Sequence, residues 1–105
     1  MSKSIYRVTL FKLPKEEDIN AILPKYSALQ NEAKMEGHPY ILSASATRTH
    51  QDPRNQGFTV CATTTFASLD DMRYYDNECE AHGAIKAFLK PRVEGPPLMV
   101  YMDKE

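Results

Sequence analysis

The fold is decided by the stretch GFTVCATTTFASLDD, which covers residues 57–71. Three consecutive threonines beside alternating apolar residues predict a strand over residues 57–66, because β-branched side chains favour an extended backbone. Ser68 is followed three residues later by Asp71, a pattern similar to a capping box, so a helix is expected to start there. The stretch therefore joins a strand to a helix within one short segment.

Outward from this stretch, strands and helices follow one another along the chain. Residues 4–12, 40–48 and 98–102 also have the composition of strands, and residues 49–56 form a polar turn, so the two middle strands are expected to make a hairpin. Apolar residues recur at helical spacing from residue 16 to 34, and a last helix is expected from Ser68 to about Lys90, with a break near Asn77. The order βαββαβ predicts an α+β fold with a ferredoxin-like protomer.

Pro24 lies inside the first predicted helix. An interior proline removes one backbone hydrogen bond and costs about 3 kcal/mol. The sequence therefore predicts a kink or a restart near residue 23. The helix is expected to end at Gly37-His38-Pro39.

Both faces of the predicted strands carry apolar residues, whereas two helices cover only one face of a sheet. The uncovered face is expected to meet a second copy of the same sheet, which makes a homodimer with the architecture of a dimeric α+β barrel. The face of Val8, Val60 and Val100 is predicted to lie between the two chains.

The 105 residues are expected to form one domain over residues 1–105. A net charge of −1 with scattered basic residues speaks against a nucleic-acid partner, and the apolar runs are too short for a membrane span. The start resembles no signal peptide, so two free thiols and a cytoplasmic location are expected. The isolated glycines form no phosphate-binding loop, and no cofactor is expected.

The candidate site residues gather on the last predicted helix. Tyr75, Cys79 and His82 are spaced four and three residues apart, so in one continuous helix they share a face. His82 is either a general base or a buried histidine satisfied by a backbone carbonyl. Cys79 is either a nucleophile or an inert buried thiol, and Cys79 with His82 makes at most half of a zinc site, so no metal is expected.

Two further residues are candidates for the same pocket. Tyr26 and Tyr75 either donate hydrogen bonds to a developing enolate or are core aromatics with a hydroxyl at the rim. Arg7 either anchors a carboxylate or thioester oxygen or pairs with an acidic neighbour across the sheet.

Four segments of the chain, at residues 6–12, 56–60, 66–72 and 75–82, together resemble the stress-responsive A/B barrel (Dabb) family, fungal members in particular. The resemblance covers nearly the whole chain. It implies a ferredoxin-like protomer and a dimer that packs sheet against sheet.

A more distant resemblance to olivetolic acid cyclase, a plant member of the family, implies an aldol-type cyclisation of a polyketide in a pocket between sheet and helices. His82 matches a working histidine of the last helix, and Tyr26 matches a pocket tyrosine. A second pocket tyrosine aligns with Asp76, one residue from Tyr75, and the family's first-strand histidine is replaced by Arg7. We therefore expect His82, Tyr75 and Tyr26 to be catalytic, and Arg7, Cys79 and Asp76 to bind the substrate.

Three hypotheses follow for the function. The first is a dimeric, lyase-like member of the family that transfers protons on a polyketide-like or aromatic small molecule. The second is a non-catalytic stress-responsive or ligand-binding dimer. In the third, the stable dimer itself is the function.

Overall fold

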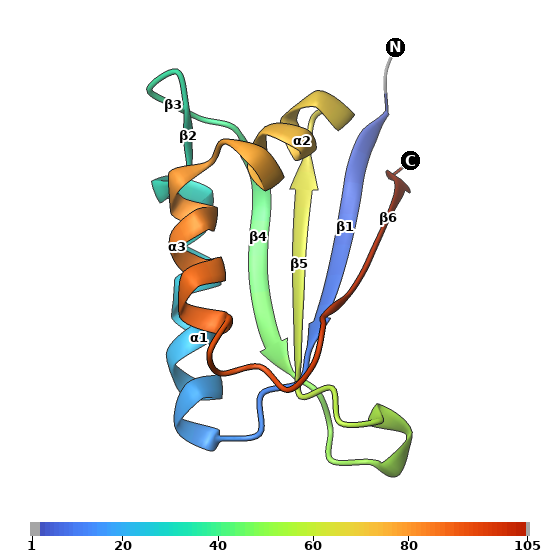
Figure 1. Ribbon diagram of the computed structural model, residues 1–105. Coiled ribbons are helices and arrows are strands. Elements are labelled where there is room, and N and C mark those ends of the chain that lie inside the picture. The colour runs from blue at the N-terminus through green and yellow to red at the C-terminus, as the bar shows by residue number, and fades with distance from the viewer. Residues whose placement is uncertain (1–2, 105) are drawn as a thin grey trace.

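The computed structural model describes residues 3–104 as a four-stranded antiparallel sheet with helices against one face (Figure 1). The sheet has the strand order β4-β5-β1-β6. Its strands are β1 (Ser4–Phe11), β4 (Ile41–Arg48), β5 (Val60–Phe66) and β6 (Leu98–Lys104), and its helices are α1 (Glu16–Glu32), α2 (Leu69–Asn77) and α3 (Glu80–Leu89). This is the ferredoxin-like α+β fold that the sequence predicts.

The boundaries of α2 and α3 follow the local sequence. The Ser68 hydroxyl caps α2 by accepting a hydrogen bond from the backbone N–H of Asp71 at 3.1 Å, as the capping pattern predicts. The break expected near Asn77 is also present, because α2 ends there and α3 begins at Glu80. The last predicted helix is therefore two helices, and this break turns out to position the site.

The first helix differs from expectation in two ways. α1 continues unbroken through Pro24, so the restart predicted near residue 23 does not occur. The helix also ends earlier than Gly37, at Glu32, and is followed by a short hairpin of β2 (Lys34–Met35) and β3 (His38–Pro39). Glu36 and Gly37 at its tip both have positive φ, the conformation that a tight two-residue hairpin turn requires.

The core lies between the helices and the inner face of the sheet. Every second residue of β1 is buried on that face, namely Ile5, Arg7, Thr9 and Phe11. In Figure 1, α1 and α3 stand beside β4, and β6 lies at the opposite edge of the sheet. On the inner face of β1, Arg7, Thr9 and Phe11 line a cavity.

The outer face of the sheet carries exposed apolar residues. Val8 pairs with Val100 across β1 and β6, and Val100 is 49% exposed in the protomer. The prediction that Val60 shares this face is wrong: Val60 pairs with Phe11, faces the helices and is completely buried. The alternation of side chains along one strand shows which residues share a face. Only the register of that strand with its neighbours shows which face packs against the helices.

The sequence predicts that no segment spans a membrane, and the lengths and composition of the helices test this prediction. Among residues 3–104, none of the helices is both long and apolar enough to cross a bilayer.

Candidate functional site

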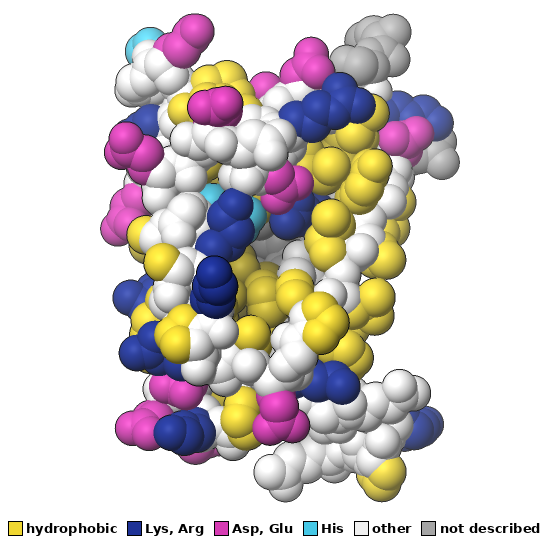
Figure 2. All heavy atoms as spheres, viewed as in Figure 1, with side chains coloured by type: hydrophobic (Ala, Val, Ile, Leu, Met, Phe, Trp, Pro, Cys, Tyr) yellow, Lys and Arg dark blue, Asp and Glu magenta, His cyan; other side chains and the backbone are white. Residues whose placement is uncertain are grey.

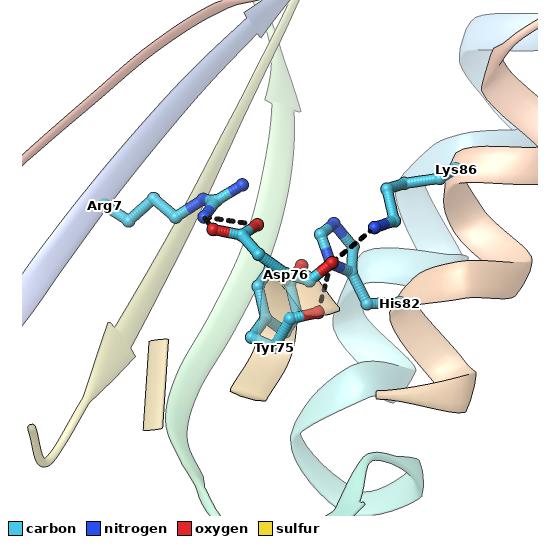
Figure 3. A network of polar contacts seen from close by, with 5 residues as sticks. All are labelled: Arg7, Tyr75, Asp76, His82 and Lys86. Atoms are coloured by element: carbon cyan, nitrogen blue, oxygen red, sulfur yellow. Dashed lines mark hydrogen bonds and ion pairs between the residues drawn. The ribbon is translucent and has the colours of Figure 1, made fainter. Parts of the chain in front are cut away.

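The break between α2 and α3 organises the candidate site. The last carbonyl groups of a helix have no partner within it and need donors from elsewhere. Here the Tyr75 carbonyl accepts a hydrogen bond from His82 Nδ1 at 2.8 Å, and the Asp76 carbonyl accepts one from Lys86 Nζ at 2.8 Å. Figure 3 shows both contacts. The end of α2 thereby fixes the positions of two side chains of α3.

The contact of His82 determines its tautomer. A carbonyl oxygen can only accept, so the proton lies on Nδ1 and the lone pair lies on Nε2. The imidazole stacks on the Tyr75 ring, with centroids 3.5 Å apart and planes 8° apart. Burial is the main cause that lowers the pKa of His82 to about 4, against the raising effect of its hydrogen bond to Tyr75. His82 is therefore neutral at physiological pH.

Arg7 is held by an ion pair that crosses the site. Its Nη1 lies 2.8 Å from each carboxylate oxygen of Asp76, and its guanidinium carbon lies 5.2 Å from the centre of the Tyr75 ring (Figure 3). The Arg7 side chain is only 9% exposed, so its charge is balanced by Asp76 and not by water. Of the two interpretations of Arg7, the pairing with an acidic neighbour is the one observed.

These residues border a cavity of about 390 Å³ between the sheet and α3. Figure 2 shows the hollow, with Lys and Arg side chains along one rim and hydrophobic side chains along the other. The size suits a small organic molecule, for which roughly 300 Å³ is the lower limit. Its polar lining consists of Arg7, Thr9, Tyr26, Thr64, Tyr75, Asp76, His82, Lys86 and Lys90, and its apolar lining includes Phe11, Ala62, Leu89, Val93, Pro96, Pro97 and Met99.

Two tyrosines of the cavity have hydroxyls without a hydrogen-bond partner. Tyr26 and Tyr75 form no hydrogen bond through their hydroxyls with residues 3–104, where only the Tyr40 hydroxyl is both fully buried and without a partner. Both side chains line the cavity and are almost completely buried in the protomer, Tyr26 at 3% and Tyr75 at 1% exposed. Burial raises the pKa of both phenols well above the ordinary value, so both remain protonated donors.

Cys79 stands apart from the other candidates. The cavity brings together His82, Tyr75, Tyr26, Arg7 and Asp76, but Cys79 does not line it. Cys79 occupies the N-cap position of α3 and is 5% exposed, with the buried Tyr40 hydroxyl beside its thiol. The helical spacing that joined Cys79 to Tyr75 and His82 assumed one continuous helix, and the break removes that shared face.

Sequence reasoning missed two lysines and the wall of the cavity. Lys86 lies four residues after His82 on α3, and Lys90 four after Lys86, so the spacing alone could have placed both on the face of His82. The wall formed by Val93, the prolines and Met99 carries no comparable signal. Among residues 3–104, no three His, Cys, Asp or Glu side chains are grouped to hold a metal ion.

Comparison with known sequences gives two matches. The family model described as Stress responsive A/B Barrel Domain matches residues 5–105. A fungal protein described as Fusaristatin A biosynthesis cluster protein, from Gibberella zeae, is 42% identical over 85 residues. The match covers 81% of this chain and 62% of the relative, so the chain spans about three fifths of the length of the curated protein.

Solved structures share the fold at low sequence identity. A hydroxynitrile lyase from Passiflora edulis has a TM-score of 0.78 and 16% identity, covering 100% of this chain and 96% of its own. A dimeric protein of unknown function from Bacteroides fragilis has a TM-score of 0.76 and 20% identity, covering 96% of each chain. A Dabb family protein from Mesorhizobium loti has a TM-score of 0.73 and 15% identity, covering 99% of each chain. At these identities the likeness shows the fold alone.

Proposed function

This chain belongs to the stress-responsive A/B barrel (Dabb) domain family, and we propose that it is a homodimer whose cavities bind a polyketide-like or aromatic molecule and transfer protons on it. One observation carries the proposal. Neutral His82 lines the same cavity as Tyr26 and Tyr75, whose hydroxyls have no partner among residues 3–104, and the Nδ1 contact of His82 leaves its Nε2 without a proton. A base beside two hydrogen-bond donors is the set that enolate chemistry requires.

The proposed reaction begins with the removal of a proton from carbon. His82 Nε2 takes the proton from a carbon next to a carbonyl group, which gives an enolate and an imidazolium whose Nδ1–H remains bound to Tyr75 O. The Tyr26 and Tyr75 hydroxyls donate hydrogen bonds to the enolate oxygen. The enolate carbon then attacks a second carbonyl of the same molecule, and the resulting alkoxide takes the proton back from Nε2.

The low pKa of His82 limits the substrate. A base whose pKa is about 4 is always available at neutral pH but is weak, and general bases work best when their pKa lies near the working pH. Such a base suits an acidic CH₂ group placed between two carbonyls, as in a poly-β-ketone. This agrees with the fungal relative, whose name places it in a biosynthesis cluster.

The dimer is proposed from the outer face of the sheet. Leu98, Val100 and Met102 of β6 are each more than 40% exposed in the protomer, on the same face as Val8. A contiguous apolar face of this kind is typical of an interface. Solved structures with this fold from Bacteroides fragilis and Thermobifida fusca are described as dimeric.

A non-catalytic ligand-binding dimer is the second candidate function. The existing hydrogen bonds of His82 and Arg7 favour it. His82 already has a hydrogen-bond partner in the backbone, and Arg7 already has one in Asp76. Both groups are thereby satisfied without a substrate. In this alternative the cavity holds a molecule and leaves it unchanged.

Turnover of a linear poly-β-ketoacyl thioester separates the two candidates. Wild-type protein should release a cyclised product, and His82→Ala should reduce turnover by about 100-fold while ligand binding is kept. His82→Asn is the matched control for structure, because its amide N–H can still donate to the Tyr75 carbonyl while no base remains. If the thioester binds but is turned over equally by all three proteins, the ligand-binding alternative holds.

A further inference from the structure

The charges that line the cavity are unequal. Arg7, Lys86 and Lys90 bring three positive charges against the single carboxylate of Asp76, which leaves a net charge of +2 with His82 neutral. The whole chain has a formal net charge of −1. Positive charge is thus gathered at the cavity, whereas the remainder of the chain is acidic.

The excess charge belongs to α3 and not to β1. Arg7 is buried and already paired with both oxygens of Asp76, so a ligand would have to displace that carboxylate to use Arg7. Lys86 of α3 and Lys90, the C-cap residue of α3, are exposed and lie one helical turn apart on the same side. An ammonium group has three donors, and Lys86 uses one of them for the Asp76 carbonyl. The Lys90 ammonium group has no hydrogen bond or ion pair with any residue of the described part of the chain; only the backbone N–H of Lys90 is bonded, to the Lys86 carbonyl.

Apolar residues also line the cavity. Phe11 and Leu89 lie among the buried residues, and Met99 lines the cavity from β6. A ligand that is complementary to this lining would place rings or a hydrocarbon chain against these apolar residues. It would place a negative charge beside Lys86 and Lys90, which form the lysine rim of the cavity. Figure 2 shows this division of the rim into a basic and a hydrophobic side.

We propose that Lys86 and Lys90 bind an anionic group of the ligand, so that the cavity selects amphipathic anions such as carboxylates, phosphates or sulfonates over neutral molecules of the same shape. The proposal rests on the proposed function, because it concerns the ligand of the same cavity. It also moves the anchoring of the negative group from Arg7, where the sequence placed it, to α3.

Two fluorescent probes with the same rings test the proposal. The anionic probe is 1-anilinonaphthalene-8-sulfonate, and the neutral probe is N-phenyl-1-naphthylamine, which lacks the sulfonate. Fluorescence titration of the double variant K86Q/K90Q should show the anionic probe bound about 5-fold more weakly than by wild type, the scale expected for two exposed ion pairs. The affinity of the neutral probe should change less than 2-fold.

Two controls locate the effect. Lys15 and Lys25 do not line this cavity, so K15Q/K25Q removes the same charge elsewhere and should leave both affinities unchanged. Val93 lines the cavity, so Val93→Trp should weaken both probes by filling it.

The outcomes separate this inference from the proposed function. If both probes bind and Val93→Trp weakens both, but K86Q/K90Q leaves their affinity ratio unchanged, the anion selectivity is refuted and the ligand cavity stands. An equal loss in K15Q/K25Q would likewise refute it, because the effect would come from net charge. If neither probe binds, or Val93→Trp weakens neither, the cavity takes no such ligand, and the proposed function fails together with the inference.

Discussion

Acidification from pH 7 to pH 4 should destabilise the protein through the protonation of His82. Burial lowers the pKa of this residue from 6.5 to about 4, so the native state binds the proton less readily than the unfolded chain does. The contribution of His82 to stability is therefore fully present above pH 6.5, decreases as the pH falls below that value and is lost below pH 4. The difference between 6.5 and about 4, at 1.36 kcal/mol for each pH unit, amounts to about 3 kcal/mol.

The structure supplies the physical cause of this loss. Protonation places a charge on an imidazole that is 4% exposed and that lies near the positive charges of Lys86 and Arg7. The new proton on Nε2 also has no acceptor among the described protein groups. The backbone hydrogen bond to Tyr75 and the carboxylate of Asp76 act in the opposite direction but do not outweigh burial.

The assay is urea unfolding followed by circular dichroism between pH 7.5 and pH 4.5, at one fixed protein concentration because the proposed dimer would make stability depend on concentration. Wild type is compared with His82→Asn, which keeps a donor for the Tyr75 carbonyl but does not titrate. All other ionisable groups are the same in both proteins, so the difference between the two curves isolates His82. The free energy of unfolding of wild type should fall by up to about 3 kcal/mol more than that of the variant. Parallel curves for the two proteins would refute the reasoning.

Two further predictions test the interface and the ion pair. Wild type should have about twice the chain mass of 11.9 kDa by light scattering, and Val100→Asp should give folded monomers, because Val100 is half-exposed in the protomer. Val60→Asp should instead unfold the protein, because Val60 is completely buried. A dimeric Val100→Asp protein would exclude this face as the interface. Asp76→Asn should cost about 2 to 3 kcal/mol by leaving the buried Arg7 charge unpaired, and Arg7→Met in the same background should recover part of that loss in urea unfolding. A cost for Asp76→Asn below about 0.5 kcal/mol would show that the pair contributes as little as a surface ion pair does.

The fold could be predicted from the sequence because its signals are local. The strand pattern of residues 57–66 and the cap at Ser68 act within a few residues, and both appear in the structure as β5 and the start of α2. Pro24 shows the limit of local reasoning. The buried face of Ile19, Ile22, Tyr26 and Leu29 packs along the helix on both sides of the proline, and this packing keeps the helix intact although one backbone bond is missing.

The arrangement of the site could be predicted only in part, because it depends on contacts between elements. The spacing of Tyr75 and His82 indicated that they are neighbours, but they stack across a helix break instead of along one helix face. The face of Val60 depends on its register with Phe11, which no single strand pattern contains. The pairing of Arg7 with Asp76 joins residues 69 positions apart in the chain, so no local pattern could indicate it.

The lysine rim and the weak base are connected through electrostatics. Lys86 and Arg7 both lower the pKa of His82, whereas the negative charge of Asp76 raises it. An anionic ligand bound at Lys86 would oppose part of this repulsion and raise the pKa of His82, so that Nε2 becomes a stronger base when the cavity is filled. By linkage, protonation of His82 must in turn strengthen the binding of the anion. A cavity that only stores its ligand gains nothing from this coupling, whereas an enzyme gains a base whose strength increases with substrate bound.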